Sequence, residues 1–196
     1  MRASCGAFGS DIVFGDLDGF IERRAATVSF EWRATPDLTL QLGGGIGHGG
    51  RLVVDGLSHE MLPGWLSAVS ASYRVLGGSE APFVPFVLVS ATLGASGART
   101  RQAGEQGTVP YSAFDLRLGV TAGKTFLDVL SPYFAARAFG GPIFWELRGE
   151  GVTGTDQRHY QLAVGIAASL PRGVDVFAEG APFGERGATV GAGVAF

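Results

Sequence analysis

Hydrolytic enzymes need a nucleophile or an activated water beside a histidine and an acid, so the histidines are the first residues to weigh. Polar side chains lie near two of the three histidines, and the residues concerned are His48, Asp55, Ser58, His59, Glu60, Asp156 and His159. No nucleophile-elbow motif is present, and no spacing among these residues matches a catalytic triad. Polar connecting loops explain them more simply, so we expect no catalytic residues and no enzyme activity.

The stretch "GDLDG" at 15–19 places Asp16 and Asp18 in a glycine-rich segment. These carboxylates fall short of a calcium site, which needs about six or more oxygen ligands. A solvated turn is the simpler interpretation, and we expect neither a metal nor a cofactor. The single cysteine, Cys5, excludes an internal disulfide framework and has no role that the sequence reveals. A net charge of −3 excludes the basic face typical of nucleic-acid binding.

Apolar residues alternate with polar or small ones along most of the chain from Thr27 onward, a period of two that is typical of strands. In the clearest example, Leu116 and Leu118 alternate with Asp115 and Arg117. No apolar run approaches the ~20 residues that a spanning helix needs. The strands that this pattern predicts are 28–32, 38–46, 65–75, 83–93, 112–122, 134–144, 160–170, 174–180 and 188–196.

The connections between these strands alternate in length. Short turns are expected at 35–37, 77–82 and 171–173, and long loops at 49–62, 95–109 and 148–157. Short turns at one end and long loops at the other are typical of outer-membrane barrels. Within the first long loop, the apolar run 52–54 has two interpretations: a surface that binds a partner, or an extension of the flanking strands.

Charged residues avoid one face of every predicted strand. A lysine or arginine facing lipid at mid-bilayer costs ~2–4 kcal/mol, so a membrane barrel needs one uncharged face. A soluble barrel with its apolar face inward shows the same alternation, but it needs more charge on its outer face than the 17% here supplies. The charged residues that we assign to the lumen are Glu31, Arg33, Arg74, Asp115, Arg117, Arg137 and Glu179.

Aromatic residues on the uncharged face lie at the two ends of the predicted strands. Such residues are enriched at both membrane–water interfaces, so their placement favours a membrane barrel over a soluble one. The expected interface aromatics are Trp32, Tyr73, Phe83 and Phe134 beside the short turns, and Trp65, Phe144 and Tyr160 beside the long loops.

The chain ends in "VGAGVAF", an alternating strand that closes on Phe196. This ending resembles the C-terminal signal of bacterial outer-membrane β-barrel proteins. The resemblance implies a location in the outer membrane of a Gram-negative bacterium, with the lipid bilayer as surroundings. It also implies that the barrel-assembly machinery reads the last strand, with Phe196 as part of the assembly signal.

Bacterial barrels of this family have an even number of strands. The alternation above gives an odd number, and 3–14, with weaker alternation, is the candidate for one more. The sequence therefore predicts an all-β fold: an antiparallel, up-and-down transmembrane β-barrel of ten strands, with eight as the alternative. We expect one domain over 1–196.

The predicted function is that of a small outer-membrane barrel with a mostly packed, charged lumen and a structural or interaction role. A narrow, porin-like channel for small polar solutes is the first alternative, and an outer-membrane hydrolase is the second. The oligomeric state is left open. The sequence contains no secretory signal peptide, which we expect to have been removed or to lie upstream of the start used here.

Overall fold

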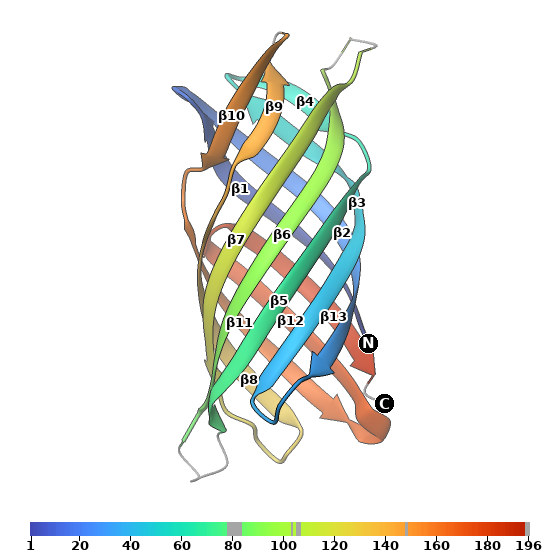
Figure 1. Cartoon of the computed structure of the whole chain (residues 1–196), viewed down its shortest axis with the longest axis vertical. Coiled ribbons are helices and arrows are strands. Elements are labelled where there is room, and N and C mark those ends of the chain that lie inside the picture. The colour runs from blue at the N-terminus through green and yellow to red at the C-terminus, as the bar shows by residue number, and fades with distance from the viewer. Residues whose placement is uncertain (78–83, 103, 105–106, 148, 195–196) are drawn as a thin grey trace.

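A computed structural model covers the whole chain and describes every residue except 78–83, 103, 105–106, 148 and 195–196. The described residues form one closed antiparallel β-barrel (Figure 1). None of them belongs to a helix long and apolar enough to cross a membrane. The strands are β1 (Arg2–Phe14), β2 (Leu17–Arg33), β3 (Leu38–Val54), β4 (Leu57–Met61), β5 (Gly64–Gly77), β6 (Phe86–Gln102), β7 (Val109–Gly123), β8 (Leu130–Gly140), β9 (Ile143–Leu147), β10 (Glu150–Asp156), β11 (Tyr160–Leu170), β12 (Val174–Gly184) and β13 (Arg186–Val194), with a 3-10 turn, η1 (Pro171–Gly173), between β11 and β12.

The all-β, antiparallel, up-and-down fold is confirmed, and the candidate strand at 3–14 is present as β1. The described part of the chain has thirteen strands where ten were predicted. The difference arises because the predicted strand 134–144 is divided into β8 and β9, and because β4 and β10 form where loops were predicted. Breaks at 62–63, at 141–142 and at 157–159 separate β4 from β5, β8 from β9 and β10 from β11. Proline explains the first two breaks, since it lacks the N–H that a ladder needs.

The barrel wall differs between its two ends. Around the end that holds Arg2 and Val194, the strands pair in the order β1, β2, β3, β5, β6, β7, β8, β11, β12, β13 and back to β1. At the opposite end, which we call the collar, the order is β1, β2, β3, β4, β6, β7, β9, β10 and back to β1. The β12–β13 hairpin stops below the collar, and β10 takes its place beside β1. The collar is therefore the narrower part of the barrel.

The long loops predicted at 49–62, 95–109 and 148–157 are mostly strand. β3 continues to Val54 and returns as β4 after a tight turn at Asp55 and Gly56, where φ is 51° and 73°. Positive φ at both central residues is the two-residue hairpin turn that Asp-Gly favours. Of the two interpretations of 52–54, the extension of the flanking strands is the one observed. These extended strands build the collar.

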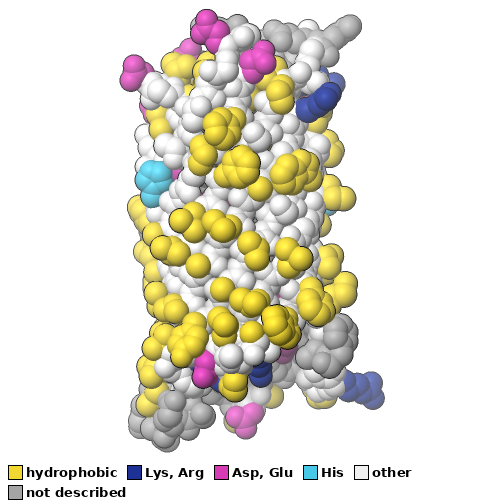
Figure 2. Space-filling view, in the orientation of Figure 1, with side chains coloured by type: hydrophobic (Ala, Val, Ile, Leu, Met, Phe, Trp, Pro, Cys, Tyr) yellow, Lys and Arg dark blue, Asp and Glu magenta, His cyan; other side chains and the backbone are white. Residues whose placement is uncertain are grey.

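The outer face of the barrel below the collar is apolar. Exposed large side chains of this face include Leu42, Val69, Leu93, Leu118, Val164 and Val190. Figure 2 shows hydrophobic side chains spread over the middle of the barrel, with acidic and basic side chains toward the two ends. The uncharged face of the strands is therefore the outer face of the barrel, as the charge pattern predicts.

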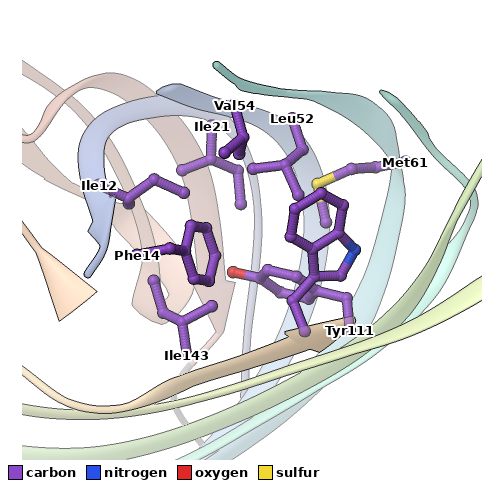
Figure 3. Packing of buried hydrophobic residues seen from close by; sticks show 9 residues of the cluster. Ile12, Phe14, Ile21, Leu52, Val54, Met61, Tyr111 and Ile143 are labelled. Atoms are coloured by element: carbon purple, nitrogen blue, oxygen red, sulfur yellow. The ribbon is translucent and has the colours of Figure 1, made fainter. Parts of the chain in front are cut away.

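The buried hydrophobic core lies inside the collar (Figure 3). Its members come from β1, β2, β3, β4, β7 and β9, and partly buried side chains of β6 and β10 pack against them. The buried residues are Ile12, Phe14, Ile21, Leu52, Val54, Met61, Tyr111, Ile143 and Trp145. Apolar side chains therefore fill the lumen at this end of the barrel.

Candidate functional site in the barrel lumen

Arg117, on β7, is the centre of the first group of charges. Its Nη1 and Nη2 donate to the two carboxylate oxygens of Glu185 at 2.9 and 3.1 Å. Its Nε donates to Asp115 Oδ2 at 3.2 Å. The guanidinium also lies over the ring of Phe139, with Cζ 4.6 Å from the ring centroid. Two carboxylates and an aromatic face thus hold this arginine in place.

Arg137, on β8, is the centre of the second group. It forms a two-pronged ion pair with Glu179 of β12, with both N–O distances at 2.7 Å. The hydroxyl of Tyr133 donates to the same carboxylate at 3.1 Å. Gln161, on β11, joins the two groups: its Oε1 accepts from Arg137 at 2.6 Å, and its Nε2 donates to Glu185 Oε1 at 2.9 Å.

One continuous network, which we call the lumen network, therefore crosses the interior between β7 and β12. It consists of Asp115, Arg117, Tyr133, Arg137, Gln161, Glu179 and Glu185. Four of the seven residues assigned to the lumen from sequence belong to it. Glu185 was missed because it lies in the last turn, and Gln161 because it carries no charge.

The other three assigned residues lie apart from the lumen network. Glu31 pairs with Arg2 at 3.1 Å, close to the N-terminus. Arg74 pairs with Asp37 at 3.0 Å and donates to Pro36 O at 2.7 Å, which ties β5 to a turn at the rim of the barrel. Arg33 is exposed at the end of β2.

The aromatic residues assigned to the interfaces lie on the outer face where the structure describes them. The exposed ones are Trp32, Trp65, Tyr73, Phe134, Phe144 and Tyr160. Phe83 and the terminal Phe196 lie outside the described residues. Phe114 adds to the edge near the collar, with its ring centroid 6.3 Å from that of Phe144 in an edge-on arrangement.

A cavity of about 450 Å³ occupies the lumen between the collar core and the lumen network. Its lining combines charged residues of the network with small residues of β1, β2 and β13, such as Ser4, Thr27 and Thr189. Asp115 contributes a buried carboxylate oxygen, Oδ1, which has no hydrogen-bond partner among the residues that the structure describes. The cavity is large enough for a small organic molecule.

Two further charged residues line this cavity near the collar. Arg23, which lies between the predicted strands 3–14 and 28–32, is only 4% exposed, and its Nη1 donates to Ser96 Oγ at 3.3 Å. Asp156, on the collar strand β10, accepts from Ser10 Oγ at 2.6 Å. Burial raises the pKa of the Asp156 carboxyl above its usual range, an effect that the hydrogen bond from Ser10 opposes.

Two histidines first weighed for catalysis, and one carboxylate first weighed for calcium, have identifiable contacts in the structure. The ring of His59 meets Trp145 edge-on, with centroids 4.8 Å apart, inside the collar. His159 Nδ1 lies 3.2 Å from the carbonyl oxygen of Phe139. Asp18 accepts from Gln157 at 3.3 Å. Within the described ranges, no group of three or more His, Cys, Asp and Glu side chains is placed to hold a metal ion.

A scan against protein-family models finds no match, and no curated protein matches the sequence. Solved structures do match. The outer membrane protease OmpT from Escherichia coli has a TM-score of 0.54 at 9% identity, covering 97% of this chain and 93% of its own. The transport unit of the autotransporter AIDA-I from Escherichia coli has a TM-score of 0.51 at 12% identity, covering 100% and 89%.

The translocator domain of the autotransporter NalP from Neisseria meningitidis gives a TM-score of 0.51 at 14% identity, covering 100% of this chain and 88% of its own. At identities this low, the similarity is evidence of a shared fold alone. These proteins differ in what their names say they do, but they share one architecture with this chain. The chain has the fold of the bacterial outer-membrane β-barrels.

Proposed function

We propose that this protein is a small β-barrel of the bacterial outer membrane whose lumen is closed, and that its role is structural or interactive. The observation that carries the proposal is the collar core. Side chains from opposite walls of the barrel meet there, and Ile12, Leu52 and Val54 are at most 1% exposed. An ion would have to pass through this apolar packing without hydration, at a high cost in free energy.

The lumen network argues against a solute-selecting channel as well. Each of its arginines is held by carboxylates at 2.7–3.2 Å, so the charges satisfy one another. Buried charges are tolerated where they are paired, and pairing them with each other makes them part of the structure. A lining that selects solutes would instead leave charges available to passing ions.

The surroundings that we propose are the lipid bilayer on the apolar outer face, between the two sets of exposed aromatics. Phe196 remains the proposed assembly signal, read by the barrel-assembly machinery during biogenesis. We further propose that the protein is not an enzyme, because Nδ1 of His159 lies 3.2 Å from the carbonyl oxygen of Phe139, where a hydrolase would present an acid.

Solute uptake tests this proposal against the narrow channel. The purified protein is refolded into phospholipid vesicles, and insertion is verified by a gel mobility that changes on boiling. We expect the vesicles to swell no faster in arabinose or glycine than protein-free vesicles do. Swelling that rises with the amount of inserted protein, and that changes when Arg117 or Glu179 is replaced by glutamine, would establish the channel instead.

A further inference from the structure

Arg23 differs from the other arginines that line the lumen cavity. Arg117 and Arg137 each hold a carboxylate, at 2.9 and 2.7 Å. Arg23 is as deeply buried as the collar core, yet among the described residues its one hydrogen bond is the 3.3 Å contact with Ser96. Its titratable neighbour is a phenol, Tyr111, whose ring lies beneath the guanidinium. No carboxylate of the described residues pairs with Arg23.

A buried guanidinium without a counter-charge is unfavourable. Its five N–H donors and its charge lose their hydration, and few protein partners compensate for the desolvation. Proteins retain such groups where a ligand supplies the missing partner. We propose that the lumen cavity is a binding site for a small organic carboxylate, and that Arg23 binds its carboxylate group.

The position of Arg23 in the cavity suits this role. Its guanidinium reaches across from β2 to Ser96 on β6 and lies 5.9 Å from the ring centroid of Tyr111 on β7. Both of these residues line the same cavity. On β3, Gly47 leaves the necessary space, since a Cβ there would come within 2.7 Å of Nη2. A carboxylate at Arg23 would therefore also have the hydroxyl of Ser96 within reach.

The rest of the lining indicates the chemistry of the ligand. Phe8, Ile21 and Ile143 line the cavity and would contact an apolar body. Asp115 and Asp156 line it too, and they would repel a second negative charge. The site therefore favours a monovalent carboxylate with an apolar body over a phosphate. Such a site does not require the barrel to conduct.

Three probes of nearly equal shape isolate the charge: benzoate, neutral benzamide and the benzylammonium cation. Binding to the full-length protein is measured by calorimetry in a neutral maltoside detergent, which adds no competing anion. We expect benzoate to bind at least about tenfold more tightly than benzamide, a difference of ~1.4 kcal/mol. Benzylammonium should bind no better than benzamide.

The variants assign this preference to one side chain. Arg23→Met should reduce benzoate affinity to that of benzamide, and Arg23→Lys, which keeps the charge, should retain part of the preference. Arg99→Met is the matched control, because Arg99 is exposed on β6 and does not line the cavity. Thermal unfolding gives a second measurement: benzoate should raise the melting temperature of the wild type but not that of Arg23→Met.

Several results would overturn the proposal. Equal affinity of the wild type for benzoate and benzamide, or no benzoate binding at millimolar concentration, would do so without any variant. A benzoate preference that survives in Arg23→Met would also do so. Inorganic phosphate that binds as tightly as benzoate would show that the site takes anions in general and not organic carboxylates. If Arg23→Met fails to fold, Arg23→Lys and the three wild-type probes still decide.

Discussion

Inside this barrel, the stability that a charged residue contributes depends on how many partners surround it. Glu179 accepts two hydrogen bonds from Arg137 and one from Tyr133, and its side chain is 17% exposed. Glu60 accepts from Arg101 at 2.6 Å on the outside of the collar, where both side chains are about half exposed. Water replaces the partner easily in the second pair and poorly in the first.

Glu179→Gln should therefore destabilise the protein by roughly 1.5–3 kcal/mol, because it leaves Arg137 without its counter-charge in a confined site. Glu60→Gln is the matched control and should change stability by about 0.2–1 kcal/mol. Urea-induced unfolding from phospholipid vesicles measures both free energies. Equal effects of the two substitutions would contradict the assignment of Glu179 to a structural network.

At the scale of single elements, one glycine decides which side chains enter the collar. β3 carries Leu42 and Ile46 on its outer face, whereas Leu52 and Val54 are fully buried inside. Between these pairs the register with β2 shifts, because four residues of β3 (47–50) lie opposite three residues of β2 (23–25). Gly49, with φ at 107°, lies in this bulge. A bulge of one residue exchanges the faces of everything beyond it.

Gly49→Ala should destabilise the protein by ~1–3 kcal/mol, because alanine disfavours this backbone conformation and its Cβ would lie 3.0 Å from Met61 O. Gly107→Ala is the control, since a Cβ at Gly107 meets nothing within 4 Å and its φ is not in the left-handed region. Vesicle unfolding in urea again supplies the measurement. An unchanged free energy of unfolding for Gly49→Ala would show that the bulge does not require glycine at this position.

This bulge also explains which parts of the structure could be predicted from sequence. Alternation identifies strands and their outer faces from Thr27 onward, since it depends on a local period of two. It assigned Arg117 and Arg137 to the lumen for the same reason. Bulges break the period, so the collar read as loops, although Asp55-Gly56 between alternating residues is a recognisable hairpin signal. Arg23 was missed with the collar, because its strand was not expected there.

At the scale of the whole molecule, an exposed leucine has different surroundings on the outer face of the barrel and in a turn at the rim. Leu118 lies on the outer face of β7 and is exposed, within the apolar surface seen in Figure 2. Leu127 lies in the turn between β7 and β8 and is 93% exposed. A bilayer surrounding the barrel would contact the first and leave the second in water.

Leu118→Arg should cost ~2–4 kcal/mol of folding free energy in vesicles, whereas Leu127→Arg should cost about 0–1 kcal/mol. The reason is the desolvation of a guanidinium in hydrocarbon, which the rim position avoids. Equilibrium refolding between urea and phospholipid vesicles compares the two variants. A cost for Leu118→Arg as small as that for Leu127→Arg would show that this face does not contact lipid.

The central claim is that the collar core, and not the lumen network, closes the barrel. Single-channel conductance in a planar bilayer tests it with two double variants, Met61→Ala with Trp145→Ala in the collar, and Arg117→Ala with Glu185→Ala in the network. We expect no steps from the wild type or the network variant, and reproducible steps from the collar variant, whose core loses the bulk of Met61 and Trp145. Steps from the wild type, or from the network variant alone, would contradict the claim.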